Sequence, residues 1–216
     1  MRTAPRALLS AATAAVVALT AAACGQLGSR SGGDDDRAPA AVTVDNVRAF
    51  AAKAQKHPKK CPVAYDIEAA AKTAGLDKPV KARTGKDVAD GELPGDEGIS
   101  PDGPLSKAKG AWVVCSYSVA GKGASLHTVA AAKGDAVSLM LPAVQSAGRL
   151  DTQELKAFYD TAGAAKPGTA AGVPDGNVAT VRLADDGKVA VMLAVERKTL
   201  TAGQTKALAT ALAGQL

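Results

Sequence analysis

The chain has 216 residues, a formal net charge of +5 from 26 Lys and Arg against 21 Asp and Glu, and an aromatic content of 3%. This length suits one domain together with targeting and linker segments. Nucleic-acid binding needs a basic face and stacking side chains, so the composition argues against a nucleic-acid partner.

Residues 1–23 have the layout of a secretory signal peptide. Arg2 and Arg6 form a basic start, and an uncharged apolar run extends from Ala7 to Ala23. This run is short for a membrane span and suits an export signal. Removal of residues 1–23 takes away two arginines, which leaves 24 basic against 21 acidic residues and a net charge of +3.

Cys24 lies between small residues and a glycine, and this arrangement resembles the lipobox of bacterial lipoproteins. The resemblance implies a diacylglyceryl group on the sulfur and Cys24 as the mature N-terminus. Residues 21–23 also form an A-x-A sequence, which an ordinary signal peptidase can cut to leave a free thiol. Lipidation accounts for the odd cysteine among three. We therefore expect a lipid anchor at the extracytoplasmic face of the cell membrane.

The rest of the chain divides into a linker and a folded region. Residues 24–42 are rich in Gly, Ser, Asp and Ala, a composition typical of a disordered linker. Residues 43–216 are expected to form a single α+β domain. Within it, the stretch near 77–110 is rich in Gly, Pro and acids and predicts a long, flexible loop.

Apolar spacing and end signals predict five helices. They span residues 43–55, a segment that starts between 62 and 66 and ends at 75, and residues 135–148, 151–163 and 201 onward. Thr43 is the expected N-cap of the first, and Gly75 is expected to take a left-handed conformation after the second. We expect capping boxes at Asp151 with Glu154 and at Thr201 with Gln204, closing glycines at 148 and 163, and a kink at Pro142.

Alternating apolar residues predict two β-hairpins. The first pairs 111–120 with 124–132 through residues 121–123, and the second pairs 177–184 with 188–196 through a turn at 186–187. Two αββα units would then share one four-stranded antiparallel sheet packed with helices. The alternation predicts burial of Val181, Leu183, Val191, Leu193 and Val195.

Cys61 and Cys115 are expected to form a disulfide, because both remain after export to an oxidising compartment. The bond would link the second helix to the sheet. The alternative is a zinc site that combines these two cysteines with His57 and His127. Its spacings match no compact zinc-finger pattern, and we expect no metal or other cofactor.

Two further groups of residues are candidates for function. Lys53, Lys56, Lys59 and Lys60 surround His57 and are either a solvated helix end or a contact for anionic headgroups or cell-wall polymers. Ser125 invites a hydrolase interpretation, but the G-x-S-x-G pattern is absent. No other catalytic motif is present, so we expect that the protein is not an enzyme.

A Cys-Pro before an Ala-rich helix and a Cys-x-Tyr strand, here Cys115-Ser116-Tyr117, resemble small envelope lipoproteins of actinobacteria that have no assigned function. The resemblance covers about residues 60–216 and implies, by analogy, a domain that senses or binds a ligand. We expect a non-enzymatic, surface-anchored binding or interaction module. Its partner would be an envelope protein, a cell-wall polymer or a small ligand, and the alternative is an extracellular hydrolase or zinc-site protein.

Overall fold

The structure, a computed structural model, describes residues 42–56, 61–83 and 102–216 of the chain. The expected signal peptide, Cys24 and nearly all of the expected linker lie outside these ranges. So do His57, Lys59 and Lys60, and residues 84–101 of the expected loop.

The described residues form six helices and six strands. The helices are α1 (Val44–Lys56), α2 (Ile67–Thr73), α3 (Pro104–Lys107), α4 (Ala136–Gly148), α5 (Thr152–Ala164) and α6 (Ala202–Ala213). The strands are β1 (Val80–Ala82), β2 (Ala111–Val119), β3 (Lys122–Ala130), β4 (Ala170–Gly172), β5 (Val178–Arg182) and β6 (Val189–Val195). The expected α+β class is confirmed.

All strands belong to one antiparallel sheet with the order β1-β2-β3-β6-β5-β4. The two predicted hairpins form its centre, where β3 pairs with β6. The prediction of four strands was incomplete, because β1 and β4 add one short strand to each edge. β1 also lies in the stretch predicted as a loop, where Val80 pairs with Val119. Each half of the sheet therefore has three strands. The second half has the order αβββα in place of the expected αββα, and in the first half the short helix α3, also within the stretch predicted as a loop, lies between β1 and β2.

The first hairpin turns one residue earlier than predicted. Val119 pairs directly with Lys122, so the connection consists of Ala120 and Gly121 alone. Both residues have positive φ, at 52° and 76°, as a type I′ turn requires. The right-handed twist of the flanking strands favours this turn, so Lys122 and Gly123 belong to β3 and not to the loop.

Helix ends follow the predicted cap chemistry in most places. Both capping boxes are present, at the starts of α5 and α6. After α2, Gly75 has φ +66°, and the N–H of Leu76 donates to the carbonyl of Ala71 at 2.9 Å. Gly75 thus takes the predicted left-handed conformation at the end of α2, and Leu76 after it is buried.

Two helix ends differ from the prediction. Gly148 is still helical, and Arg149 takes the left-handed position after α4, with φ 52°. Helix α5 continues past Gly163 to Ala164, and Ala165 is its C-cap. An alanine-rich sequence stays helical through a single glycine at a cost of about 1 kcal/mol, so glycine alone does not end a helix. Pro142 lies inside α4, and the expected kink stays a prediction.

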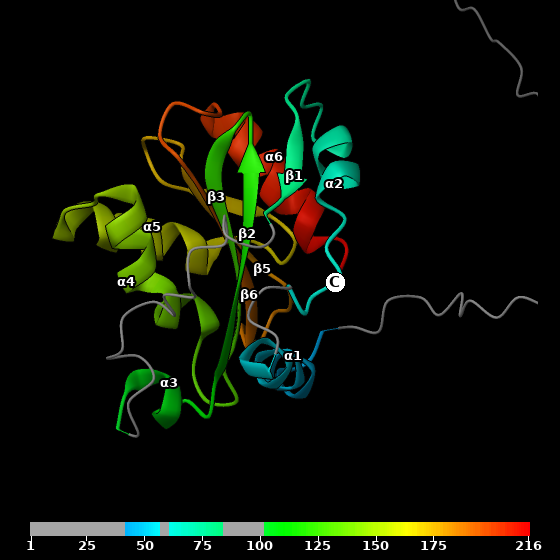
Figure 1. Ribbon diagram of the computed structural model, residues 1–216. Helices are drawn as coiled ribbons and strands as arrows, with labels where there is room; N and C mark the ends of the chain where they lie inside the picture. The colour runs from blue at the N-terminus through cyan, green and yellow to red at the C-terminus, as the bar shows by residue number, and fades with distance from the viewer. Residues whose placement is uncertain (1–41, 57–60, 84–101) are drawn as a thin grey trace, which may run out of the picture. The chain divides into compact units, whose positions relative to one another are not determined.

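Helices cover the two faces of the sheet unequally (Figure 1). The first face packs against α1, α2 and α6, whose buried contacts include Val47, Ile67 and Leu208. The second face packs against α4 and α5, through Val137 and Phe158 among others. Helices α4 and α5 contact β3 to β6, and Trp112 near the start of β2 packs against the same cluster. Within the described residues, no helix covers the second face of β1 or of the rest of β2.

Burial along the strands reflects this asymmetry. Every residue of β6 is buried, whereas alternate residues of β2 are half-buried on the second face. Of the residues predicted to be buried, Val181, Val191, Leu193 and Val195 are buried and Leu183 is partly buried. In the ranges that the structure describes, no helix is long and apolar enough to span a membrane.

Candidate functional site

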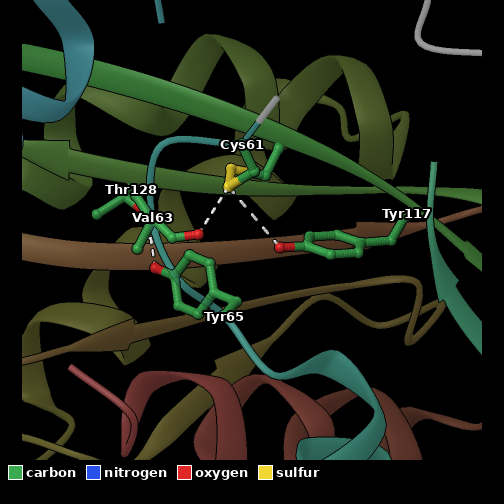
Figure 2. The surroundings of a disulfide bond; sticks show 6 residues. Cys61, Val63, Tyr65, Tyr117 and Thr128 are labelled. Atoms are coloured by element: carbon green, nitrogen blue, oxygen red, sulfur yellow. Dashed lines mark hydrogen bonds between the residues drawn. A yellow bond between two sulfur atoms is a disulfide. The ribbon is translucent and has the colours of Figure 1, made fainter. Parts of the chain in front are cut away.

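The predicted disulfide between Cys61 and Cys115 is present, with a Cα–Cα distance of 5.2 Å (Figure 2). Cys115 lies in the middle of β2 on the first face and is 2% exposed. Cys61 is itself exposed and lies in the segment that leads into α2, in which Val63 is buried. The bond therefore links this segment to the sheet, and α2 begins at Ile67, with Asp66 as its N-cap.

Two tyrosines lie beside the disulfide (Figure 2). The hydroxyl of Tyr117 donates weakly to Sγ of Cys61 at 3.9 Å, and that of Tyr65 lies 2.7 Å from Oγ1 of Thr128. Burial raises the pKa of Tyr117 to about 12 and that of Tyr65 above its usual range. Both phenols therefore stay neutral at physiological pH and act as hydrogen-bonding core residues.

The alternative zinc site is not formed. Both cysteine sulfurs are consumed by the disulfide, and a metal needs free thiolates. His127 already has a hydrogen-bond partner on each ring nitrogen, and His57 lies outside the described residues. In the described ranges no three His, Cys, Asp or Glu side chains are grouped as metal ligands.

The lysine cluster is described only in part. Lys53 and Lys56 lie in the last turn of α1 and are exposed, while Lys59 and Lys60 fall outside the described residues. The ammonium of Lys53 lies 6.0 Å from the centroid of the Phe50 ring, within cation–π range. Positive charge at a helix C-terminus also complements the helix dipole, which gives both lysines a structural role.

Ser125, the candidate hydrolase residue, does contact His127. The imidazole is the donor in this hydrogen bond, however, whereas a nucleophilic serine must donate its proton to the imidazole. The indole N–H of Trp112 donates to Nδ1 of His127 at 3.1 Å. An indole nitrogen only donates, so Nδ1 is the acceptor and Nε2 carries the proton. Nε2 therefore donates to the Ser125 hydroxyl, 3.0 Å away. A general base would need to accept the serine proton at that nitrogen.

Burial fixes the charge of this imidazole. His127 is 8% exposed, and desolvation lowers its pKa to about 4. The ring is therefore neutral at physiological pH, and the donors run in one direction, from Trp112 through His127 to Ser125. One of the two lone pairs of the Ser125 hydroxyl accepts from His127, and its own O–H remains available to donate to another group.

Ser125 opens onto the part of the second face that no described helix covers. We call this surface the open face, and it consists of Lys81, Arg83, Val114, Ser116, Ser118 and Ser125. Ser116 pairs directly with Ser125, and Ser118 with Gly123, so their side chains lie on the same side of the hairpin. Lys81 pairs with Ser118 from the neighbouring strand.

Arg83 reaches across β2 towards β3. Its backbone N–H donates to the carbonyl of Ser116 at 3.1 Å, and its Nη1 lies 3.5 Å from the point where a Cβ on Gly123 would be. The guanidinium therefore lies over Gly123, where there is no side chain. Among the described residues, Glu196 lies next to Gly123, since its N–H donates to the carbonyl of Gly123, and its carboxylate pairs with Lys122 at 3.1 Å.

A shallow groove of about 380 Å³ lies between α2 and β1. Its lining has charges of both signs, with Glu68 and Asp77 beside Lys72, Lys78 and Lys81. The ammonium of Lys78 already donates to the carbonyl of Thr199. The charged side chains that line the groove therefore have mixed sign, whereas those of the open face are all positive.

Sequence reasoning identified Ser125 and His127 but missed Trp112, Lys81 and Arg83. The signal for Trp112 was available, because hairpin register places even-numbered β2 residues on the face of His127. No sequence pattern indicated the position of Arg83, because Arg83 follows β1, a strand of three residues that is too short to be predicted from alternation. No protein-family model, curated protein or solved structure matches this chain.

Proposed function

We propose that this protein is a lipid-anchored, non-enzymatic binding module at the outer face of the cytoplasmic membrane, and that the open face binds its partner. The anchor rests on the lipobox-like sequence at Cys24. The observation that carries the binding role is the half-covered sheet. Helices bury both faces of β6, but the described residues leave polar and cationic side chains of β1, β2 and β3 accessible on one face.

Two further features support a binding role over a catalytic one. The Ser125–His127 hydrogen bond runs from the imidazole to the hydroxyl, so this pair does not generate a nucleophile. The disulfide links the segment before α2 to β2, which restrains the sheet beneath the open face. A preorganised surface loses less conformational entropy when it binds a partner.

Site-specific photo-crosslinking in cells tests the binding role. A photoreactive benzoylphenylalanine replaces Val114, which is half-buried on the open face, in the full-length protein. The matched control places the same residue at Lys156, an exposed site on α5. We expect a defined adduct from position 114 alone. Equal labelling from both positions, or none from position 114, would contradict the proposed surface.

Metabolic fatty-acid labelling tests the anchor separately. We expect the wild-type protein to incorporate label and to sediment with membranes, and Cys24→Ser to lose both properties. A wild-type protein without label would instead support the A-x-A cut and a free N-terminal thiol.

A further inference from the structure

We infer that the open face binds a phosphate-bearing polyol, with Arg83, Lys81 and Ser125 on the phosphate and Ser116 and Ser118 on the hydroxyl groups. This inference rests on the proposed binding function and names the ligand chemistry of the same surface. It follows from the direction in which each polar group of the open face can hydrogen-bond.

The groups at one end of the open face act as donors. A guanidinium and an ammonium have no acceptor atoms, and no described residue forms an ion pair with Arg83 or Lys81. Ser125 joins them as a donor, because its hydroxyl accepts from His127 Nε2 and its own O–H is then available to a ligand. A chain of hydrogen bonds polarises its members, so the bond from Trp112 strengthens Ser125 as a donor.

Charge on this surface is positive. Glu196 is paired with Lys122, and among the described residues no carboxylate forms an ion pair with Arg83 or with Lys81, which also borders the groove that contains Glu68 and Asp77. An arginine fork binds phosphate or carboxylate through two parallel hydrogen bonds. A carboxylate has two oxygens and one negative charge. A phosphate group has more oxygens and more charge, which matches the two cations, Lys81 and Arg83, together with the hydroxyl of Ser125.

The dimensions fit one phosphate and a short polyol. Adjacent strands lie about 4.8 Å apart, so the donors on β1 to β3 span about 10 Å, and the long side chain of Arg83 reduces that span by crossing β2. Ser116 and Ser118 are about 7 Å apart along β2, since each residue advances about 3.4 Å. Their hydroxyls donate and accept, which suits ligand hydroxyl groups next to the phosphate.

Titration with glycerol 3-phosphate tests the inference directly. The full-length protein, purified in detergent, is followed by NMR at the indole N–H of Trp112, the chain's single tryptophan. We expect a saturable shift of this resonance with glycerol 3-phosphate and none with glycerol. Inorganic phosphate should bind at least threefold more weakly, because it lacks the groups that Ser116 and Ser118 recognise. Equal affinity for inorganic phosphate, or equal affinity for glycerate, would overturn the assigned ligand class.

Variants then locate the site. Arg83→Gln should weaken glycerol 3-phosphate binding about tenfold or more, and Arg83→Lys less, because lysine keeps the charge but loses the fork. Ser125→Ala should weaken it about threefold to tenfold. Lys156→Gln on α5 is the matched control and should leave affinity unchanged. Unchanged affinity in Arg83→Gln would overturn the site.

The crosslinking experiment separates this inference from the proposed function. If the adduct at position 114 persists at full yield in Arg83→Gln, the open face binds a partner but the phosphate assignment is wrong. If glycerol 3-phosphate binds at Arg83 and position 114 gives no adduct in cells, the ligand chemistry is right and the proposed partner-binding function is wrong.

Discussion

The indole N–H of Trp112 lies 3.1 Å from Nδ1 of His127, and this single donor decides which imidazole nitrogen is protonated. Because Nδ1 accepts, Nε2 donates, and Ser125 receives that bond. Trp112, His127 and Ser125 of this chain therefore form a series of hydrogen bonds in which each residue donates to the next. The direction of the series, and not the list of residues, decides between a nucleophile and a hydrogen-bond donor for a ligand.

The first prediction concerns the pKa of His127. Burial lowers this pKa to about 4 in the wild-type protein, and the bond from Trp112 further favours the neutral ring. Trp112→Phe removes the N–H and leaves Nδ1 free to bind a proton. We expect the pKa of His127 to rise by about 0.7 units, as follows from a hydrogen bond of about 1 kcal/mol. NMR of the imidazole ring against pH measures it.

Ser125→Ala is the matched control for that prediction. It removes the acceptor of the Nε2 proton, and a protonated imidazole makes that bond more strongly than a neutral one. The pKa of His127 should therefore stay the same or fall in Ser125→Ala. An equal rise in both variants would mean that general loosening of the site, and not the Trp112 bond, controls the pKa. The chain has two histidines, so a His57→Gln background assigns the signal.

The second prediction is a loss of stability in mild acid. The pKa of His127 is about 4 in the folded chain and about 6.5 in the unfolded chain, so between these values the unfolded state binds more protons. The free energy of unfolding therefore falls as pH drops from about 6.5 through 4, by up to about 3 kcal/mol. Above pH 6.5 both states are neutral at this ring and the contribution is constant.

Urea unfolding of the wild type and His127→Gln at pH 7, 5.5 and 4.5 measures this contribution. Carboxylates also titrate in the range, but they are common to both proteins, so the difference between the two curves isolates His127. We expect this difference to shift in favour of the variant as pH falls. Parallel pH profiles would mean that His127 is hydrated in the folded state.

Local sequence patterns predicted the central hairpins and the helix caps, because these features depend on residues close in the chain. Asp151 and Glu154 form their capping box within one turn, and the β2–β3 register follows from a two-residue turn. The edge strands β1 and β4 could not be predicted in this way. Three residues form a strand only when a partner such as Val119 or Val181 is placed beside them by the rest of the fold.

The open face was unpredictable for a related reason. Alternation along β2 identified two faces but did not say which helices cover them. Helices α2 and α4, which flank the first half of the sheet, pack on opposite faces. The exposure of Ser116 and Ser118 is thus decided by where distant helices pack, and short-range periodicity contains no information on that.

The third prediction compares two glycines at the ends of helices. Gly75 has φ +66°, and a Cβ there would meet no atom within 4 Å, so the cost of Gly75→Ala is conformational only. We expect a loss of about 1 kcal/mol in the free energy of unfolding. Gly163 is also free of neighbours within 4 Å but lies inside α5, with ordinary helical backbone. Gly163→Ala should therefore stabilise the protein by up to about 1 kcal/mol. Thermal unfolding of the two variants measures both, and shifts of the same sign would contradict this account.

The fourth prediction concerns the disulfide, which closes a loop with a sequence separation of 54 residues. In the chain-entropy model, a loop of this size stabilises the folded state by about 4 kcal/mol, against a typical stability of about 5–15 kcal/mol. We expect the double variant Cys61→Ala with Cys115→Ala to lose most of this amount, measured by urea unfolding. Reduced wild-type protein should lose a similar amount, which separates loss of the bond from loss of the side chains.

Alkylation of the native protein checks the bond itself. Cys115 is 2% exposed, and both sulfurs are oxidised, so neither should react until a reductant is added. After reduction, Cys61 should react first, because Cys61 is exposed, whereas Cys115 is buried in the core cluster that includes Tyr117. Reaction of both thiols without reductant would contradict the disulfide. Reaction that requires only a chelator would restore the zinc site, in which both sulfurs are thiolates that a bound metal protects.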